Sequence, residues 1–424
     1  MVFRLVLVAA LLLVQSWFHG EARAEPATGN PATEKPATEK NEFSPKLIIY
    51  LAKGRADSCG PGCDRWIAVE GEVDSGAAAR IRRFLRDVKD TQRPIYFHSP
   101  GGSVEQSFAI GRLLRNRKAI ARVGRTIVTA CAAGSQVDDA CLKTKTGGGE
   151  IEAEIATRNA MCNSACSYLF FGATTREVAP DAGVVVHDSR LTLFFHGHPT
   201  PAQVAEFKAR DLLKADRERT SYLHSMGISP ELEDLIRTVK FENRHLLTRA
   251  ELYRFGIDTR PFAETLWTLE TSARPFVRKI AVAKQDDGTS FRSMDWRLFC
   301  ENKDRARLMF VQEFDKGAAG KSRVVMTAGS EKPVAFGSSP ARVGDYQIWS
   351  STIAPDPMKT ILAAPHLQMG EATSTPDGKD NLSTFEIDTS GLEPAWTELL
   401  GSCPAPTVAL PATAAPDLAS APAP

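Results

Sequence analysis

The pattern of apolar and polar positions divides the chain into two regions of different periodicity. In the first region, short apolar runs alternate with stretches of helical period. The runs predict strands at 47–51, 66–71, 94–99, 120–129 and 182–187. The helical stretches are 75–89, 103–117, a segment beginning near Ser164, 201–226, 229–240 and 248–255. Alternation of this kind predicts an α/β fold, with a mostly parallel sheet covered by helices.

The helix at 75–89 shows its period most clearly. Apolar residues recur at 81, 84, 85 and 88 and form one face, as expected for a helix packed on a core. Ser75 is a plausible N-cap residue. Four arginines are expected to face water as a solvated surface, at positions 80, 82, 83 and 86. Residues 131–158 contain Cys131, Cys141 and three consecutive glycines, and we expect an irregular insertion there.

The pattern of apolar and polar residues changes from about Phe262 onward. Stretches that alternate apolar and polar residues are separated by Gly, Pro, Asp and Asn turns. Helical pattern is scarce until 391–400. This region predicts a smaller, mainly antiparallel β domain after the α/β domain. Cys300 lies in its first strong strand and Cys403 closes its end, so a disulfide between them is expected.

The two ends of the chain do not have the composition of folded domains. Arg4, the apolar run 5–14 and the small residues at 22 and 24 predict a cleaved secretory signal peptide. The alternative is an uncleaved membrane anchor, but the run is shorter than the ~18–20 residues that a spanning helix needs. A PAT repeat of period five follows, and such a sequence cannot bury a core, which predicts a disordered tether.

These observations give a predicted division of the chain. The segments are a signal peptide at 1–24, a disordered linker at 25–45, an α/β domain at 46–262, a disulfide-closed β domain at 263–403 and a disordered Pro/Ala tail at 404–424. The mature protein is expected to be periplasmic or secreted, with no membrane span after cleavage of the signal peptide.

Charge and cysteine content narrow the function classes. The 424 residues include 52 Lys and Arg against 51 Asp and Glu, a net charge of +1. A nucleic-acid binder needs a clustered basic excess, so this class is excluded. Eight cysteines in an exported chain suggest up to four disulfides.

We expect the eight cysteines to form four disulfides. They are Cys59–Cys63, Cys131–Cys141, Cys162–Cys166 and Cys300–Cys403. A rival pairing crosses Cys131 or Cys141 with Cys162 or Cys166, and the sequence leaves it open. Zinc is the other interpretation of the cysteines, but their spacings do not match the usual zinc patterns. No metal and no cofactor is therefore expected.

Four segments of the first region could carry chemistry. They are the F-H-S-P-G-G-S turn at 97–103, the small-residue turn M-C-N-S-A-C at 161–166, His187 at the end of a predicted strand, and a helix within 246–258 that ends at a glycine. A diglycine turn before a helix exposes main-chain N–H groups that can bind an anion. Each segment also has an ordinary structural interpretation, because Ser164 could simply cap a helix.

In their order and spacing these segments resemble the Clp protease proteolytic subunit/crotonase superfamily, in particular its secreted, periplasmic Clp-protease-like branch. That family has an S-P-G-G turn, a turn with the nucleophilic serine, a G-x-x-x-R motif and a strand that ends in the catalytic histidine. The matching positions here are 99–102, Ser164, Gly172 with Arg176, and His187. The late L-[ST]-x-x-E segment of the family is similar to 247–257.

The resemblance implies a role for each matching residue. Ser164 would be the nucleophile, His187 the general base, and the N–H groups of Gly101 and Ala165 the oxyanion hole. The triad acid of the family has no clean counterpart, because Arg244 occupies its slot. The nearby candidates for a third member are Asn243, Glu242 and Asp188.

The leading hypothesis from the sequence is an exported serine hydrolase, probably a peptidase that acts on a peptide or protein substrate. Crotonase-type acyl-thioester chemistry is a second enzyme hypothesis, although coenzyme A is an intracellular cofactor. The rival from another class is a non-catalytic binding or scaffold protein that has lost the triad acid. Contact of His187 Nδ1 with a carboxylate or Asn distinguishes these hypotheses. No feature of the sequence indicates an oligomeric state.

Overall fold

The computed structural model describes residues 43–44, 46–132, 135–191, 193, 195, 197–313, 322–329, 334–336, 340–374 and 380–403. The predicted signal peptide, almost all of the predicted linker and the predicted tail lie outside the described residues. Within the described part, no helix is both long and apolar enough to cross a membrane.

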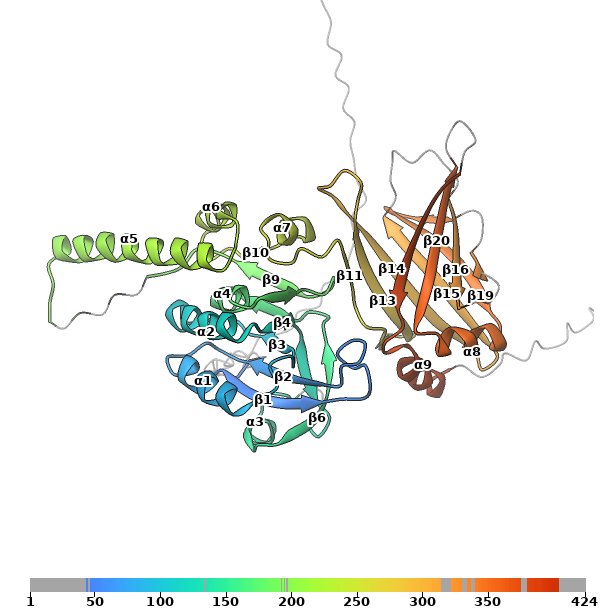
Figure 1. Cartoon of the computed structure of the whole chain (residues 1–424), viewed down its shortest axis with the longest axis horizontal. Helices are drawn as coiled ribbons and strands as arrows, with labels where there is room; N and C mark the ends of the chain where they lie inside the picture. The colour runs from blue at the N-terminus through green and yellow to red at the C-terminus, as the bar shows by residue number, and fades with distance from the viewer. Residues whose placement is uncertain are drawn as a thin grey trace, which may run out of the picture. The chain divides into compact units, whose positions relative to one another are not determined.

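A seven-stranded sheet forms the centre of the first region (Figure 1). Its strand order is β5-β6-β1-β2-β3-β4-β8. Four neighbouring pairs are parallel and two are antiparallel, β1 with β2 and β5 with β6. The predicted mixed α/β fold with a mostly parallel sheet is confirmed. The strands are β1 (Ile48–Lys53), β2 (Arg65–Glu70), β3 (Ile95–His98), β4 (Ile120–Val123), β5 (Arg125–Val128), β6 (Glu150–Ala156) and β8 (Thr175–Glu177).

Both faces of this sheet are covered, and the alternation of side chains along β2 shows how. Ile67 and Val69 belong to the main core, together with residues from several helices. Trp66 and Ala68 point to the other face and join a smaller core with residues of β5 and β6. A strand buried on both faces reads as a continuous apolar run, which is why this one was predictable. Among the helices that contribute to the main core are α1 (Ala77–Asp87), α2 (Val104–Arg117) and α4 (Ala165–Phe171).

The start of α1 differs from the prediction. Gly76, not Ser75, is the N-cap residue, and it makes no side-chain cap. The carboxylate of Asp74 instead accepts the N–H groups of Gly76 at 2.9 Å and Leu47 at 3.1 Å. Arg80 was expected to face water, but it pairs with Asp74 and donates to the Leu47 carbonyl. One aspartate therefore ties α1 to the start of β1.

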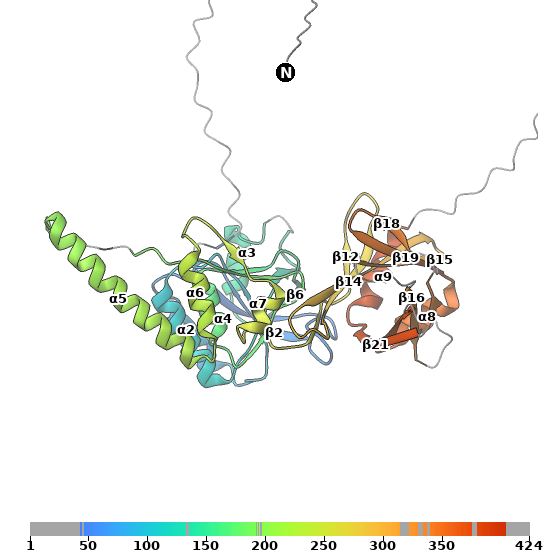
Figure 2. The same cartoon turned by 90° about the horizontal axis from the view of Figure 1, so that it is seen from above.

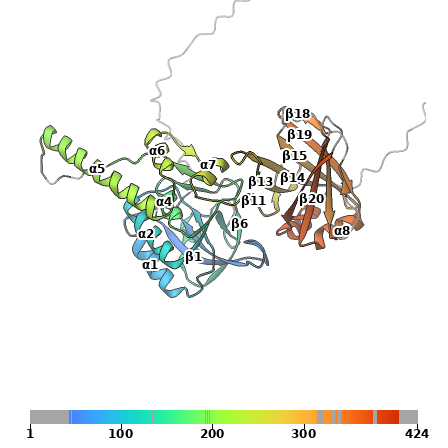
Figure 3. The same cartoon turned by 45° about the horizontal axis from the view of Figure 1, so that its top comes forward.

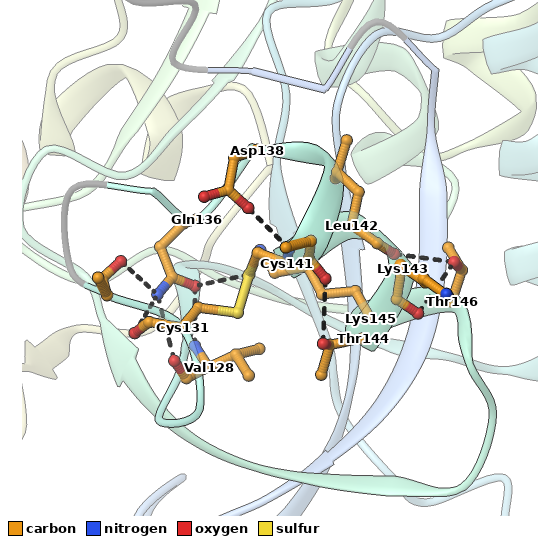
Figure 4. Close-up of a disulfide and its surroundings, with 12 residues drawn as sticks. Val128, Cys131, Gln136, Asp138, Cys141, Leu142, Lys143, Thr144, Lys145 and Thr146 are labelled. Carbon is orange, nitrogen blue, oxygen red and sulfur yellow. Dashed lines mark hydrogen bonds between the residues drawn. A yellow bond between two sulfur atoms is a disulfide. The ribbon is translucent and has the colours of Figure 1, made fainter.

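Residues 131–158 are not the irregular insertion that we expected. They contain α3 (Asp139–Thr146) and strand β6, which pairs in parallel with β1. Figure 4 shows how the segment before α3 is fixed: the Cys131–Cys141 disulfide closes it, and the Gln136 side chain bonds main-chain groups of Val128. The cysteines and glycines of this segment suggested irregular structure, so the helix and the strand of the central sheet were not predicted.

The predicted strand at 120–129 is also different, because it is two strands. The chain turns at Gly124 between β4 and β5. A Cβ atom at this glycine would lie 2.6 Å from Cδ1 of Tyr96, so only glycine fits the bend. After this turn the chain forms β5, which pairs with β6 at the edge of the sheet.

A second, three-stranded sheet carries the candidate site. It consists of β7 (Met161–Asn163), β9 (Gly183–Val186) and β10 (His245–Leu246), in the order β10-β9-β7. Between β9 and β10 the chain forms α5 (Pro201–Ser225) and α6 (Pro230–Thr238), and α7 (Arg249–Arg254) follows β10. The first turns of α5 extend away from α6 and the sheet (Figure 2). The three helices predicted in this stretch are confirmed.

The second region is β-rich and has its own hydrophobic core. Its two sheets are built from antiparallel pairs, as predicted (Figure 3). Helix α9 (Leu392–Gly401) was expected. Helix α8 (Pro355–Ala363) was not predicted, because the prolines in its first turn suggested a loop. The strands are β11 (Phe262–Glu264), β12 (Thr268–Glu270), β13 (Phe276–Lys284), β14 (Phe291–Asn302), β15 (Arg305–Glu313), β16 (Ser322–Ala328), β17 (Val334–Ala335), β18 (Ala341–Val343), β19 (Tyr346–Ile353), β20 (His366–Ser374) and β21 (Asp380–Asp388).

All eight cysteines form disulfides in the pairs that we expected. The structure joins Cys59–Cys63, Cys131–Cys141, Cys162–Cys166 and Cys300–Cys403. The rival crossed pairing is therefore wrong. Four disulfides are compatible with an extracellular or periplasmic protein.

Candidate functional site

The turn between β7 and α4 positions Ser164. Asn163, the last residue of β7, lies opposite Val185 of β9, and the Ser164 N–H donates to the Val185 carbonyl at 2.8 Å. Helix α4 begins at the next residue, Ala165. The backbone of Ser164 has φ 53° and ψ −120°. This conformation is rare for a residue with a side chain and costs of order 1–3 kcal/mol.

Several contacts hold this strained turn in place. The Cys162–Cys166 disulfide spans it, with both sulfurs buried. The hydroxyl of Ser167 lies 3.1 Å from the carbonyl oxygen of Cys162 and 2.9 Å from that of Val185, and its single proton is shared between them. The surrounding structure therefore fixes Ser164 rather than leaving it to relax, which is typical of residues at functional sites.

The diglycine turn lies directly against Ser164. A Cβ atom on Gly101 would stand 2.8 Å from the Ser164 Cβ and 3.1 Å from the Ala165 nitrogen. A Cβ atom on Gly102 would lie 2.5 Å from the carbonyl oxygen of Val73. Both glycines have positive φ, at 102° and 135°. The close approach of the two turns requires glycine at both positions.

The structure brings the two expected oxyanion donors to one place, but they differ in their bonding. Ala165 is the first residue of α4, where a helix leaves its N–H groups without an intrahelical partner. The Gly101 N–H instead donates to the hydroxyl of Ser99 at 3.1 Å. A substrate oxygen would have to compete with that hydroxyl for Gly101. Nothing in the sequence pattern indicated this contact.

His187 follows the last residue of β9. Because Asn163 pairs with Val185 in a parallel register, Ser164 and His187 leave neighbouring strands within one residue of each other. His187 Nδ1 lies 2.7 Å from the carbonyl oxygen of Asp188, and the ring packs edge-on against Phe241 at 5.0 Å. Among the hydrogen bonds of the described residues, none joins the Ser164 hydroxyl to this ring.

The side chains of the candidate third members do not bond to His187 Nδ1. The Glu242 carboxylate pairs with Arg190 at 2.9 Å. The Asp188 carboxylate accepts from Arg219 at 3.2 Å. Asn243 closes a turn, its N–H donating to the Lys240 carbonyl. Within the described part of the chain, the Nδ1 atom is hydrogen-bonded to a main-chain carbonyl, and sequence reasoning missed this partner.

The remaining two motifs meet in a structural role. The guanidinium of Arg176 donates to the carbonyls of Gly256 at 2.8 Å and Ile257 at 2.9 Å, which lie beyond α7. It also reaches Phe171 at the end of α4, at 2.7 Å. Burial lowers the pKa of Arg176 to about 10, and the group stays charged at neutral pH. Arg176 therefore connects the helix of the candidate serine to the segment at 247–257.

The described residues offer no cluster of three or more His, Cys, Asp or Glu side chains that could hold a metal ion. The groups that the two turns and the end of β9 contribute to this site are a hydroxyl, an imidazole and main-chain N–H groups. The fold and the site define a mixed α/β protein with a strained serine at a strand–helix turn.

Comparisons with known proteins identify no family. No protein-family model and no curated protein sequence matches the chain. Solved structures with some likeness include invasion associated protein b from Bartonella henselae, 14% identical over 32% of this chain and 93% of that one, with a TM-score of 0.25. A variant of the membrane-bound stomatin-specific protease 1510-N is 14% identical over 44% of this chain and 73% of that one, with a TM-score of 0.26. A second variant of that protease, in complex with a substrate peptide, is 13% identical and also has a TM-score of 0.26, over 44% of this chain and 69% of that one. Scores this low do not establish a shared fold.

Proposed function

We propose that this protein is an exported serine hydrolase with a Clp/crotonase-like fold, and that it cleaves peptide bonds. Ser164 attacks the substrate carbonyl, His187 accepts the serine proton, and the N–H groups of Gly101 and Ala165 bind the oxygen that becomes negative. The substrate is a peptide or an unfolded protein segment that reaches the turn between β7 and α4.

The observation that carries this proposal is the backbone of Ser164. A serine that only capped α4 would have extended φ and ψ, as Ser103 has at the start of α2 with φ −73° and ψ 117°. Ser164 instead has φ 53° and makes no side-chain cap. Nucleophilic serines at strand–helix turns adopt such strained conformations, because the turn lifts the hydroxyl toward the substrate.

The bonding of His187 Nδ1 supports the assigned role. A carbonyl oxygen can only accept a hydrogen bond, so the proton of the neutral ring lies on Nδ1. Nε2 is then free of a proton and can accept one from Ser164. A dyad of this kind acts without a triad acid, although the acid normally fixes the tautomer.

A second candidate function is a non-catalytic binding protein on the same fold. The observation that favours it is the Gly101 N–H, which is already bonded to Ser99. In that function the turn would hold a ligand without breaking a bond in it.

Labelling with a fluorophosphonate probe separates the two functions. We expect the full-length disulfide-bonded chain to be labelled and the Ser164→Ala variant to show no labelling above background. Ser221→Ala, on the exposed surface of α5, is the matched control and should label like the wild type. Labelling of Ser164→Ala at the wild-type rate, or no labelling of the wild type, would contradict the hydrolase and favour the binding protein.

A further inference from the structure

Asp188 is held on three sides, and its carbonyl is the group that faces His187. Its N–H donates to the carbonyl of Val239, the residue that follows α6, at 2.8 Å. Its carboxylate accepts from the Ser189 N–H at 2.8 Å and from Arg219 at 3.2 Å. The carbonyl oxygen, the remaining polar group, lies 2.7 Å from His187 Nδ1.

Arg219 is the side chain that connects this peptide to the helices. It belongs to α5, and only 7% of its side chain is exposed. Besides Asp188 it pairs with Asp216 at 2.6 Å and with Glu233 of α6 at 3.6 Å. The buried guanidinium is fixed in direction by two hydrogen bonds, from Nη1 to Asp188 and from Nη2 to Asp216. It therefore fixes the position of the Asp188 carboxylate.

We propose that Arg219 is a positioning residue for His187. By holding Asp188 it fixes the main-chain carbonyl that accepts the Nδ1 hydrogen bond, and this carbonyl takes the place of the triad acid. The inference rests on the proposed function for the role of His187 as a base. The orienting step itself does not depend on any reaction, since it is a property of the resting tautomer.

The chemistry requires such a partner. A neutral imidazole has two tautomers, and only the form with its proton on Nδ1 can accept the serine proton at Nε2. A hydrogen-bond acceptor at Nδ1 selects this form, as carboxylates do in triads. A carbonyl carries no full charge and stabilises the imidazolium less than a carboxylate does. Its effect therefore depends on how well it is held in place.

The resting tautomer tests the proposal without any substrate. Long-range nitrogen–proton NMR spectra of full-length protein labelled with ¹⁵N-histidine report which ring nitrogen carries the proton. The His187 signal is assigned by its loss in His187→Gln. We expect the Nδ1–H form in the wild type at neutral pH and a mixture of tautomers in Arg219→Met. A wild-type His187 with its proton on Nε2 would overturn the proposal.

Rates of fluorophosphonate labelling test the consequence. Loss of the outer partner that orients a metal-bound histidine costs about 10–100-fold. We expect an effect of similar size here, so Arg219→Met should label at least tenfold more slowly. Arg219→Lys keeps the charge but not the fork of donors, and it should fall between Arg219→Met and the wild type. The matched control is Arg237→Met, which removes an ion pair with Glu233 but does not touch Asp188. It should label within twofold of the wild type.

The variant Asp188→Asn tests whether the main-chain carbonyl of residue 188 or its side-chain carboxylate orients His187. It keeps the carbonyl and an oxygen that can accept from Arg219, so the Nδ1–H form should persist and labelling should fall less than tenfold. A loss near 10⁴-fold, the size expected when a triad acid is removed, would overturn the proposal. So would a folded Arg219→Met that keeps both the Nδ1–H form and the wild-type rate. If no protein is labelled, the proposed function fails, while the His187 spectrum still decides the positioning role.

Discussion

Lys145 is almost completely buried, and its replacement is a direct test of how α3 is attached to the sheet. Its side chain is 2% exposed, and its ammonium lies 2.8 Å from the carboxylate of Glu70 in β2. The same carboxylate accepts from the Tyr50 hydroxyl at 2.9 Å and from the Thr126 N–H at 3.0 Å. Burial and the Glu70 charge raise the pKa of Tyr50, so this hydroxyl remains a donor at all ordinary pH values.

The expected cost of Lys145→Met follows from these contacts. Removing one partner of a buried ion pair costs about 3–5 kcal/mol, because the other charge stays buried. Two neutral donors remain on Glu70, so we expect the lower end, about 3 kcal/mol. With a urea slope of about 3 kcal/mol per molar for a region of this size, the midpoint of unfolding falls by roughly 1 M.

The assay must report on the first region alone, because the chain has more than one core. Hydrogen exchange in urea, followed by mass spectrometry of peptides from β2 and α3, gives a local midpoint. Lys143→Met is the matched control, since Lys143 lies on the same helix but is exposed. Its midpoint should change by less than about 0.5 kcal/mol, as for most surface substitutions. Equal midpoints for the two variants would refute the buried ion pair as the attachment of α3.

Two further predictions concern pH and the disulfides. Burial, together with nearby cations, lowers the pKa of His98 to about 3, below its ordinary value of 6.5. Between these two pH values His98 is therefore protonated in the unfolded chain but neutral in the folded chain. Stability should fall as pH decreases from about 6.5 toward 3, by up to about 1.4 kcal/mol per pH unit, and urea midpoints of His98→Gln should show a flatter slope in this range or the reasoning fails. The Cys300–Cys403 bridge closes a loop of 103 residues and the Cys59–Cys63 bridge one of 4, so replacing the first pair by Ala should cost about 5 kcal/mol and the second about 2. Equal losses in denaturant unfolding would contradict the loop-length argument.

The sequence predicted those parts of the fold in which a local pattern determines the structure. The run W-I-A-V-E in β2 indicated a strand buried on both faces, and the period of α1 indicated its buried side. Strand β6 was missed although E-I-E-A-E-I alternates in the way that half-buried strands do. Its position after three glycines and a disulfide loop suggested irregular structure, and only pairing with β1 shows that it completes the sheet.

The candidate site was predictable to the level of its turns but not of its hydrogen bonds. The roles implied for Ser164 and Gly101 require the small-residue turn and the diglycine turn to lie together, and Gly101 packs against Ser164. The partner of His187 Nδ1 could not be found in this way, because a main-chain carbonyl has no signature in the sequence. Nor could the pairing of Arg219 with Asp188, which are 31 residues apart and meet only through the path of α5.

The strain at Ser164 and the missing triad acid lead to opposite expectations, and their free energies can be compared. Strain of order 1–3 kcal/mol is maintained by a disulfide and by the Ser167 hydroxyl, which shares its proton between two carbonyls. A turn that only bound a ligand through N–H groups would gain nothing from a left-handed serine, since glycine there would relieve the strain. Loss of the acid, by contrast, leaves a tautomer to be fixed, and the carbonyl of Asp188 is placed to fix it. The maintained strain is therefore the stronger argument, and it favours a nucleophile over a ligand-binding turn.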